Sequence, residues 1–274
     1  MKQKVSRIDY SKAMLPRTRR EQFSDCFKMN YALILKCGLL LFTFALPLIG
    51  FCLFMDFYYV SLSQHATEAV DQTLLIFFYL YNLGVVILCV PIVVGLGGVT
   101  HVLRNFIWGE GIFFKSDIGL GIKENTGKNV LFFLFLGIFY LLSYFIYSMF
   151  GVPIVSYLPL ALFALILFPI YLWIVFLNNT YKSGFGALLR NGTFFYVKSL
   201  GWSLLGSIML LSLVALLVIP IYLIWIKYLI VALFFIFLLP IVILLMTLYS
   251  TYKFDNYINK ETYPDHFLKG LNHD

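Results

Sequence analysis

Long stretches without a charged residue constrain this chain more than any other feature of its sequence. Segments 37–55, 73–99 and 129–181 contain no Asp, Glu, Lys or Arg, and segment 200–252 contains only Lys227. An unpaired charge near the centre of a bilayer costs on the order of 3 kcal/mol on insertion scales. Because a helix needs about 20 apolar residues to cross the hydrocarbon layer, these stretches predict membrane spans.

The two longest stretches are each more than twice as long as one span requires, so each predicts two helices joined by a turn. Gly151, Pro153 and Pro159 predict the first turn, and Trp225–Tyr228 predict the second. The chain then has six spans, between a basic cytoplasmic arm at 1–30 and a cytoplasmic tail at 253–274. The predicted spans are 37–58, 73–99, 129–150, 155–178, 200–225 and 228–251.

Composition supports a membrane protein, because 61% of the 274 residues are apolar and 12% are charged. A soluble domain is about half apolar and about a quarter charged. The runs show no alternation of apolar and polar residues, so they predict helices and not barrel strands. The first run is too long for a signal-peptide core, which makes it a membrane anchor. The predicted fold class is an all-α polytopic transmembrane bundle.

The distribution of lysine and arginine predicts the orientation of the spans. The first thirty residues are rich in both, whereas the loop at 61–72 has neither and carries Glu68 and Asp71. The loops at 100–128 and 182–199 and the tail are basic again. Since basic loops stay on the cytoplasmic side, both termini are expected in the cytoplasm of a cell-membrane protein. This bias also accounts for the net charge of +7 without a nucleic-acid partner.

Ionisable groups are scarce in the predicted spans, which argues against an enzyme. Asp56 is the nearest candidate, and its tyrosine-rich setting is typical of the membrane interface. The four cysteines and four histidines are scattered, with no CxxC or HxxxH pair, so neither a metal site nor another cofactor is expected.

Glycine and proline in the spans indicate close helix packing and kinks. The glycines predicted to pack helices are Gly95, Gly97 and Gly98 in the second span and Gly201 and Gly206 at the start of the fifth. The prolines predicted to kink helices are Pro47, Pro91, Pro169, Pro220 and Pro240.

Two basic inner loops share one sequence pattern. Lys115–Lys123 and Lys182–Arg190 both follow K-S-x-φ-G-x-x-φ-[KR], where φ is apolar, which indicates an internal repeat of helix, loop and helix. The interleaved apolar and basic residues would let a short helix lie in the headgroup layer. Its role would be either anchoring to anionic lipid or docking of a cytoplasmic partner. The candidate contact residues are Arg104, Lys115, Lys123, Lys182, Arg190 and Lys198.

Several short motifs between about Pro91 and Leu210 resemble the YesL-like family of bacterial membrane proteins. They are Val102-Leu103-Arg104, Gly109-Glu110-Gly111, Asp117, Lys123-Glu124-Asn125 and the segment Ala187–Phe195. Here an additional span and a basic arm precede the region of likeness. Members of that family tend to be encoded beside carbohydrate-uptake and polysaccharide-degradation functions in Gram-positive bacteria. The resemblance therefore implies an accessory role in sugar or glycan uptake.

Three functions remain open at this stage. The leading hypothesis is a non-enzymatic membrane subunit or assembly factor that works with a carbohydrate ABC-type transporter, binding its permease or ATPase. The chain has no Walker motif of its own and lacks the glycine loop by which sugar permeases engage their ATPase. The second hypothesis is a stand-alone transporter of a small solute, and the third is a membrane enzyme.

Overall fold

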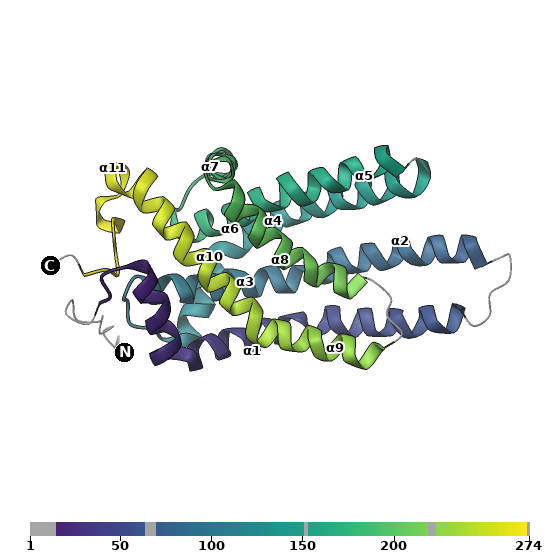
Figure 1. Cartoon of the computed structure of the whole chain (residues 1–274), viewed down its shortest axis with the longest axis horizontal. Coiled ribbons are helices and arrows are strands. Elements are labelled where there is room, and N and C mark those ends of the chain that lie inside the picture. Colours follow the sequence, from purple (N-terminus) through teal and green to yellow (C-terminus); the bar gives the residue numbers. More distant parts are fainter. Residues whose placement is uncertain (1–14, 64–69, 151–152, 219–222, 273–274) are drawn as a thin grey trace.

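The computed structural model describes residues 15–63, 70–150, 153–218 and 223–272, which form helices joined by short connections (Figure 1). Six helical stretches in this part are long and apolar enough to cross a membrane. The predicted all-α polytopic bundle is therefore confirmed, and the chain is a multi-pass membrane protein. The candidate spans are Asn30–Ser61, Ile76–Ile107, Phe114–Ile146, Tyr157–Thr180, Leu200–Leu217 and Ile224–Thr262.

The α-helices are α1 (Arg19–Ser63), α2 (Val70–Leu88), α3 (Val90–Ile107), α4 (Phe114–Phe150), α5 (Pro153–Leu162), α6 (Phe168–Thr180), α7 (Phe185–Lys198), α8 (Leu200–Val218), α9 (Ile224–Leu233), α10 (Leu239–Phe254) and α11 (Lys260–Thr262). Three π-helical turns interrupt them, namely η2 (Phe163–Leu167), η3 (Phe234–Leu238) and η4 (Asp255–Asn259), and one 3-10 turn, η5 (Pro264–His266), precedes the C-terminus.

Spans 2, 4 and 6 are each broken at a Pro-Ile pair. Span 2 changes from α2 to α3 at Pro91, span 4 passes through η2 to Pro169, and span 6 passes through η3 to Pro240. Proline has no backbone N–H and its ring crowds the carbonyl four residues earlier, which favours an interruption of the helix. Helices are interrupted at these three prolines, as predicted. Helix α1 continues through Pro47 without an interruption, and Pro220 lies outside the described residues.

The carbonyls that lose their helical partner at two of these prolines meet other groups. Pro169 cannot donate to the carbonyl of Leu165, which instead accepts a hydrogen bond from the Tyr196 hydroxyl at 2.8 Å. Pro240 cannot donate to Ile236, whose carbonyl lies so close to Gly38 of α1 that any Cβ there would overlap it. The hydrogen bond from Tyr196 matters in hydrocarbon, because each unpaired backbone group there costs several kcal/mol.

The three broken spans share a sequence register that extends to their last residues. A basic residue follows thirteen positions after each proline, and these residues are Arg104, Lys182 and Lys253. In spans 4 and 6 the basic residue completes the same tripeptide, Thr-Tyr-Lys. The chain is thus organised as three helical hairpins, spans 1–2, 3–4 and 5–6, each ending in a broken span.

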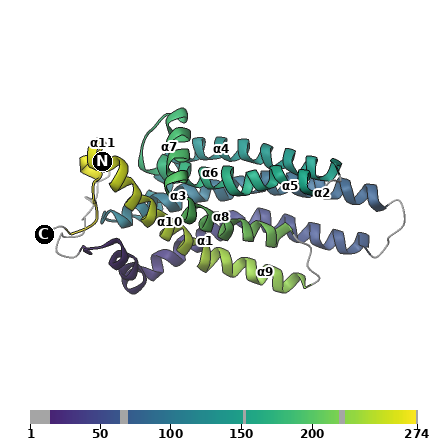
Figure 2. The same ribbon diagram turned by 45° about the horizontal axis from the view of Figure 1, so that its top comes forward.

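This arrangement differs from the repeat predicted from the two basic loops. Lys115–Lys123 is part of α4, which runs on into span 3, whereas Lys182–Ser183–Gly184 is a connection that leads into the separate helix α7. Figures 1 and 2 show α7 lying across the bundle, at a large angle to the spans. Only one of the two segments therefore forms the short transverse helix that we expected.

Some helices are longer than the predicted spans. Helix α4 has 37 residues, on the order of 55 Å at the usual rise, against a hydrocarbon core of about 30 Å. Pro159 lies inside α5, and Trp225–Tyr228 belong to α9. The predicted turns at these residues are wrong, because α5 and α9 begin earlier, at Pro153 and Ile224.

The two described ends of the chain meet at one end of the bundle. The backbone N–H of Asn272 donates to the carbonyl of Pro16 at 2.9 Å, and Gln22 donates from Nε2 to the carbonyls of Ile107 and Gly270. We call this end, which also carries α7 and the connection 108–113, the basic end, and the opposite one the far end.

Glycine allows close contact between α3 and α4. A Cβ on Gly121 of α4 would lie 2.5 Å from Cβ of His101 and 2.8 Å from the carbonyl oxygen of Gly97. Gly97 and Gly98 face α4 from the other side, while Gly95 faces Phe44 of α1. Small residues at such positions let membrane helices approach closely.

Replacing Gly121 with alanine should therefore destabilise the bundle. The new methyl group has no room, and overpacking of this kind costs about 1–3 kcal/mol. Gly127→Ala on the same helix is the matched control, because nothing lies within 4 Å of its Cβ position, and alanine favours helices by about 0.5–1 kcal/mol. Thermal melts of the purified variants should show a lower midpoint for Gly121→Ala only; equal midpoints would contradict the packing.

Candidate functional site

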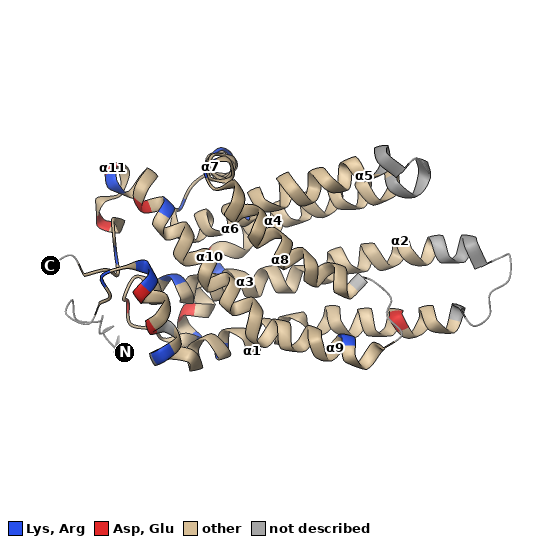
Figure 3. Cartoon of the chain, in the orientation of Figure 1, with Lys and Arg blue, Asp and Glu red and all other residues tan. Residues whose placement is uncertain are grey.

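Charged residues are concentrated at the basic end (Figure 3). Two polar centres lie below the surface of the described part of the chain. One joins spans 2, 3, 4 and 6 at the basic end, and the other is an ion pair toward the far end. The first contains Arg104, one of the predicted site residues, whereas the second contains none of them.

Arg104 is a structural centre and not an exposed loop residue. It lies on α3, half-buried, and its guanidinium donates to the carbonyl of Asn179 at the end of α6. The same group bonds the side-chain oxygen of Asn105 at 2.9 Å and contacts Nδ1 of His101 at 3.2 Å. It also lies 4.7 Å from the centre of the Trp108 ring, a favourable cation–π distance. Arg104 thereby ties span 2 to span 4.

Buried asparagines extend this centre to span 3. Asn125 donates to the Asn179 side chain at 2.9 Å, and Asn178 donates to the Asn129 side chain at 2.9 Å and to the Asn125 carbonyl at 3.1 Å. All four are nearly inaccessible. Buried amides contribute stability only when they are paired, so this network fixes the register of α4 against α6.

The C-terminal segment closes over the same centre. Tyr181, directly after α6, donates its hydroxyl to the Asn259 side chain at 2.5 Å, and Asn259 donates to Asp255 at 2.8 Å. Asp255 also accepts from Arg19 of α1 at 2.9 Å. Burial raises the pKa of Tyr181, and the nearby Asp255 carboxylate adds to the effect. Tyr181 therefore stays a neutral donor at physiological pH.

A second set of contacts, which we call the C-terminal clasp, joins the C-terminal segment to the connection 108–113 after α3. Lys269 pairs with Glu110 at 2.6 Å, and its ammonium lies 4.4 Å from the centre of the Trp108 ring. The His266 ring also packs against Trp108, with ring centres 4.9 Å apart. These interactions close the interior at the basic end.

The other predicted contact residues lie on the surface. Lys115 and Lys123 are exposed on α4, and Arg190 and Lys198 are exposed on α7. Lys182 is exposed and lies 3.8 Å from Glu124, a surface pair that contributes little stability. The sequence therefore located a set of exposed cations, with Arg104 as the exception.

The connection before α7 and the first residue of α7 contact α4 just beyond the other predicted basic segment. Lys128 of α4 donates to the carbonyl of Ser183 at 2.6 Å, just before α7. The rings of Phe132 and Phe185 stack with centres 3.9 Å apart. We call the surface formed by the start of α4 and by α7 the α4–α7 face.

Helix α7 is held by a narrow buried stripe. Leu188, Gly192 and Phe195 face inward, and Phe195 stacks on Trp173 of α6 with ring centres 5.2 Å apart. A Cβ on Gly192 would lie 2.9 Å from Ile174. Leu189 and Val197 are exposed beside the cations of this helix, so its outer side combines apolar and basic groups.

The predicted packing glycines of span 5 behave differently from one another. A Cβ on Gly206 would lie 2.9 Å from the Met246 side chain of α10, whereas Gly201 faces open space. Gly206 thus lets α8 approach α10. Gly201 makes no close contact within the described part of this chain.

Asp56 of α1 and Lys227 of α9 form a buried ion pair, with Nζ and Oδ2 2.7 Å apart. Their side chains are 4% and 0% exposed, respectively. Tyr228 donates its hydroxyl to the same carboxylate oxygen at 2.8 Å. A carboxylate that receives both a cation and a hydroxyl can be buried among apolar helices, where an unpaired charge would be costly. The pair connects span 1 to span 6.

Asp56 was predicted to be an interfacial carboxylate, and the structure adds that its side chain is buried and paired with a cation. The tyrosines that follow it in sequence suggested the headgroup layer, but its partner is distant in sequence. One signal was available, because Asp56 and Lys227 are opposite charges that each border a long stretch without other charges.

Comparison with protein-family models, curated proteins and solved structures finds no match. The candidate sites therefore rest on the geometry alone, and the described residues contain no group of three or more His, Cys, Asp or Glu side chains that could hold a metal ion.

Breaking the buried ion pair should be costly, and replacing both partners should not. Lys227→Met leaves Asp56 buried without its cation, which costs about 3–5 kcal/mol, whereas an uncharged replacement of a whole pair is often neutral. The double variant Asp56→Asn, Lys227→Met keeps an oxygen acceptor for Tyr228. Thermal melts in detergent should show a large loss for the single variant and recovery in the double one; equal losses would contradict a coupled pair.

His266 should make the stability of the C-terminal clasp sensitive to acid. Burial lowers the pKa of His266, and the positive charges of Lys269 and Arg104 lower it further, against the opposing effect of Asp265 and Glu110. The unfolded chain therefore binds a proton below about pH 6.5, where the folded chain resists it.

The melting temperature should consequently fall as the pH drops from about 7 to about 5. His266→Gln, which carries no charge at any of these pH values, should show a shallower decline. The same slope in the variant and the unmodified protein would remove His266 as the cause.

Proposed function

We propose that this chain is a non-enzymatic integral membrane subunit that binds a partner through its α4–α7 face in the cytoplasm. The observation that carries the proposal is the contact between the start of α7 and the middle of α4, because both helices carry exposed cations and exposed apolar side chains. Mixed apolar and basic surfaces suit association with acidic protein surfaces, because complementary charge speeds encounter and selects the partner.

The proposed partner is the permease or ATPase of a carbohydrate ABC-type uptake system in the cell membrane of a Gram-positive bacterium. This part rests on the resemblance to the YesL-like family. In that setting the basic end faces the cytoplasm, where an ATPase would be accessible.

The interior of the bundle favours an accessory role over passage of a sugar. The cavities between the spans are lined by apolar side chains such as Val85, Leu136 and Leu213. A sugar hydroxyl buried there without a partner would cost about 2–7 kcal/mol. At the basic end, moreover, hydrogen bonds of Arg104 and the ion pair of the C-terminal clasp link the helices and the C-terminal segment.

A stand-alone transporter of a small solute is the second candidate, and two observations favour it. Three spans are broken near their middles, and a buried ion pair lies between spans 1 and 6. Broken helices and intramembrane charges are features of transporter sites. Uptake of a solute by liposomes that contain this chain alone would establish this alternative.

Mild-detergent purification of the tagged chain from its native host should recover transporter subunits in near-equal amounts, identified by mass spectrometry. The double charge reversal Lys123→Glu, Arg190→Glu should lower their recovery by about tenfold, since like charges across an interface cost several kcal/mol. Lys28→Glu is the control, because Lys28 is also exposed at the basic end but lies on α1. Recovery of the chain alone would contradict the proposal.

Arg190→Lys separates partner docking from lipid anchoring. An arginine that forms forked hydrogen bonds to a protein is not replaced by lysine, whereas attraction to anionic lipid contributes about 1 kcal/mol for either residue. Docking therefore predicts reduced recovery of the partner with Arg190→Lys, and unchanged recovery would favour lipid anchoring.

A further inference from the structure

The breaks in spans 2, 4 and 6 converge on two adjoining cavities in the middle of the bundle. The larger cavity has a volume of about 330 Å³ and the smaller one about 140 Å³. Cys89, at the break in span 2, and Phe168, at the break in span 4, line both cavities, and Leu239, at the break in span 6, lines the smaller one. The kinks separate the helices here, so side chains do not fill the space.

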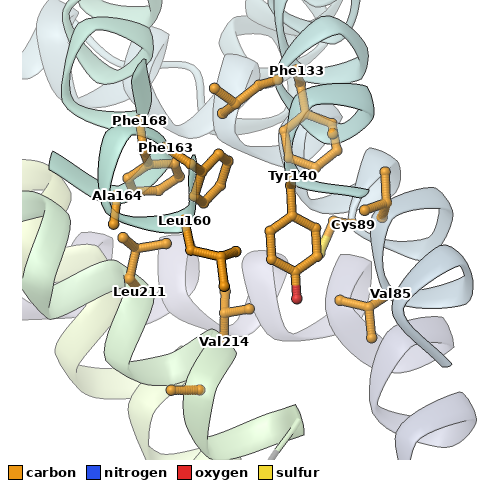
Figure 4. Close-up of a pocket in the computed structure, with 14 residues that line it drawn as sticks. Val85, Cys89, Phe133, Tyr140, Leu160, Phe163, Ala164, Phe168, Leu211 and Val214 are labelled. Atoms are coloured by element: carbon orange, nitrogen blue, oxygen red, sulfur yellow. The ribbon is translucent and has the colours of Figure 1, made fainter. Parts of the chain in front are cut away.

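The larger cavity is lined almost entirely by hydrocarbon (Figure 4). Tyr140 supplies a hydroxyl, which is already engaged as a donor to the Asn82 side chain at 2.5 Å. Cys89 supplies a thiol, and no charged side chain lines the cavity. Water needs about two to four polar partners to occupy a cavity, so this one does not suit water.

The exposures of the lining residues place the mouth of the cavity between α5 and α8. Val85 and Val86 on α2 and Leu136 on α4 are buried and form the inner wall. Leu160 of α5 and Leu211 of α8 are half-buried, and Ala215 of α8 is exposed. These residues belong to the candidate spans or their apolar extensions, so the mouth opens toward the hydrocarbon of the bilayer.

We propose that the larger cavity is a binding site for one acyl chain of a membrane phospholipid, which enters between α5 and α8. An empty space of this size loses the dispersion contacts of its whole lining, and the neighbouring solvent is itself hydrocarbon. The volume is at the lower end of the range of small-molecule sites, roughly 300–1,000 Å³. The headgroup stays outside, because the cavity offers it neither charge nor a free hydrogen-bonding group.

Ala164 and Ala161 provide a matched pair of variants for the test. Ala164 lines the cavity, whereas Ala161, one turn earlier on the same span, is exposed. Ala164→Phe should fill the cavity, and Ala161→Phe adds the same ring to the lipid-facing side. Ala215→Phe places a ring at the mouth from an exposed position, so it tests entry without overpacking the interior.

The probe is a phosphatidylcholine that carries a diazirine near the end of one acyl chain, mixed at low content into phosphatidylcholine vesicles containing the purified protein. After illumination, mass spectrometry of the digested protein should find cross-links on Tyr140 and Phe163 of the lining. Both Ala164→Phe and Ala215→Phe should lower these cross-links by about tenfold relative to those on the exposed Ile138, because lost methylene burial weakens binding.

Ala161→Phe should leave the ratio unchanged. Cross-links confined to exposed residues such as Ile138 in the unmodified protein, or the same ratio in all variants, would overturn the proposal and show a cavity without lipid. A thermal melt of each variant accompanies the measurement, and Ala215→Phe decides the outcome if Ala164→Phe does not fold.

Discussion

Backbone hydrogen bonding in hydrocarbon is the constraint on which the rest of this structure depends. In hydrocarbon a carbonyl that loses its helical partner needs another hydrogen-bond donor, and the structure supplies one at the break in span 4. The Tyr196 hydroxyl bonds the carbonyl freed by Pro169, and Gly38 leaves room beside the carbonyl freed by Pro240. Because Tyr196 lies on α7, the transverse helix is linked to the break in span 4. The same breaks create the apolar cavities in the middle of the bundle.

The polar groups of the chain are arranged around that apolar middle. At the basic end, Arg104 and the buried asparagines hold spans 2, 3 and 4 together, and Asp255 joins span 6 to α1 through Arg19. Toward the far end, Asp56 and Lys227 join span 1 to span 6. These contacts hold the bundle together at two levels. Exposed cations of the α4–α7 face such as Lys123 and Arg190 lie outside both of them, whereas Lys182 pairs with Glu124.

The sequence predicted the helical class and the number of spans, because length and absence of charge decide both. Span ends were less predictable: the first half of α4 is polar enough to read as a loop, but contacts with α3 through Gly97 and Gly121 make it helical. The Asp56–Lys227 pair and the burial of Arg104 depend on which helices become neighbours, and no local pattern contains that information. The resemblance to the YesL-like family and the proposed partner remain predictions.

The central claim is that six spans cross the membrane with the basic end, and hence both termini, in the cytoplasm. Topology reporters fused at four points test it most directly. A fusion after His65, outside the described residues, should report the external side, and fusions after Ile112, Gly192 and Lys260 should report the cytoplasm, because basic connections stay inside. A cytoplasmic signal from the His65 fusion, or an external one from any of the other three, would contradict the account.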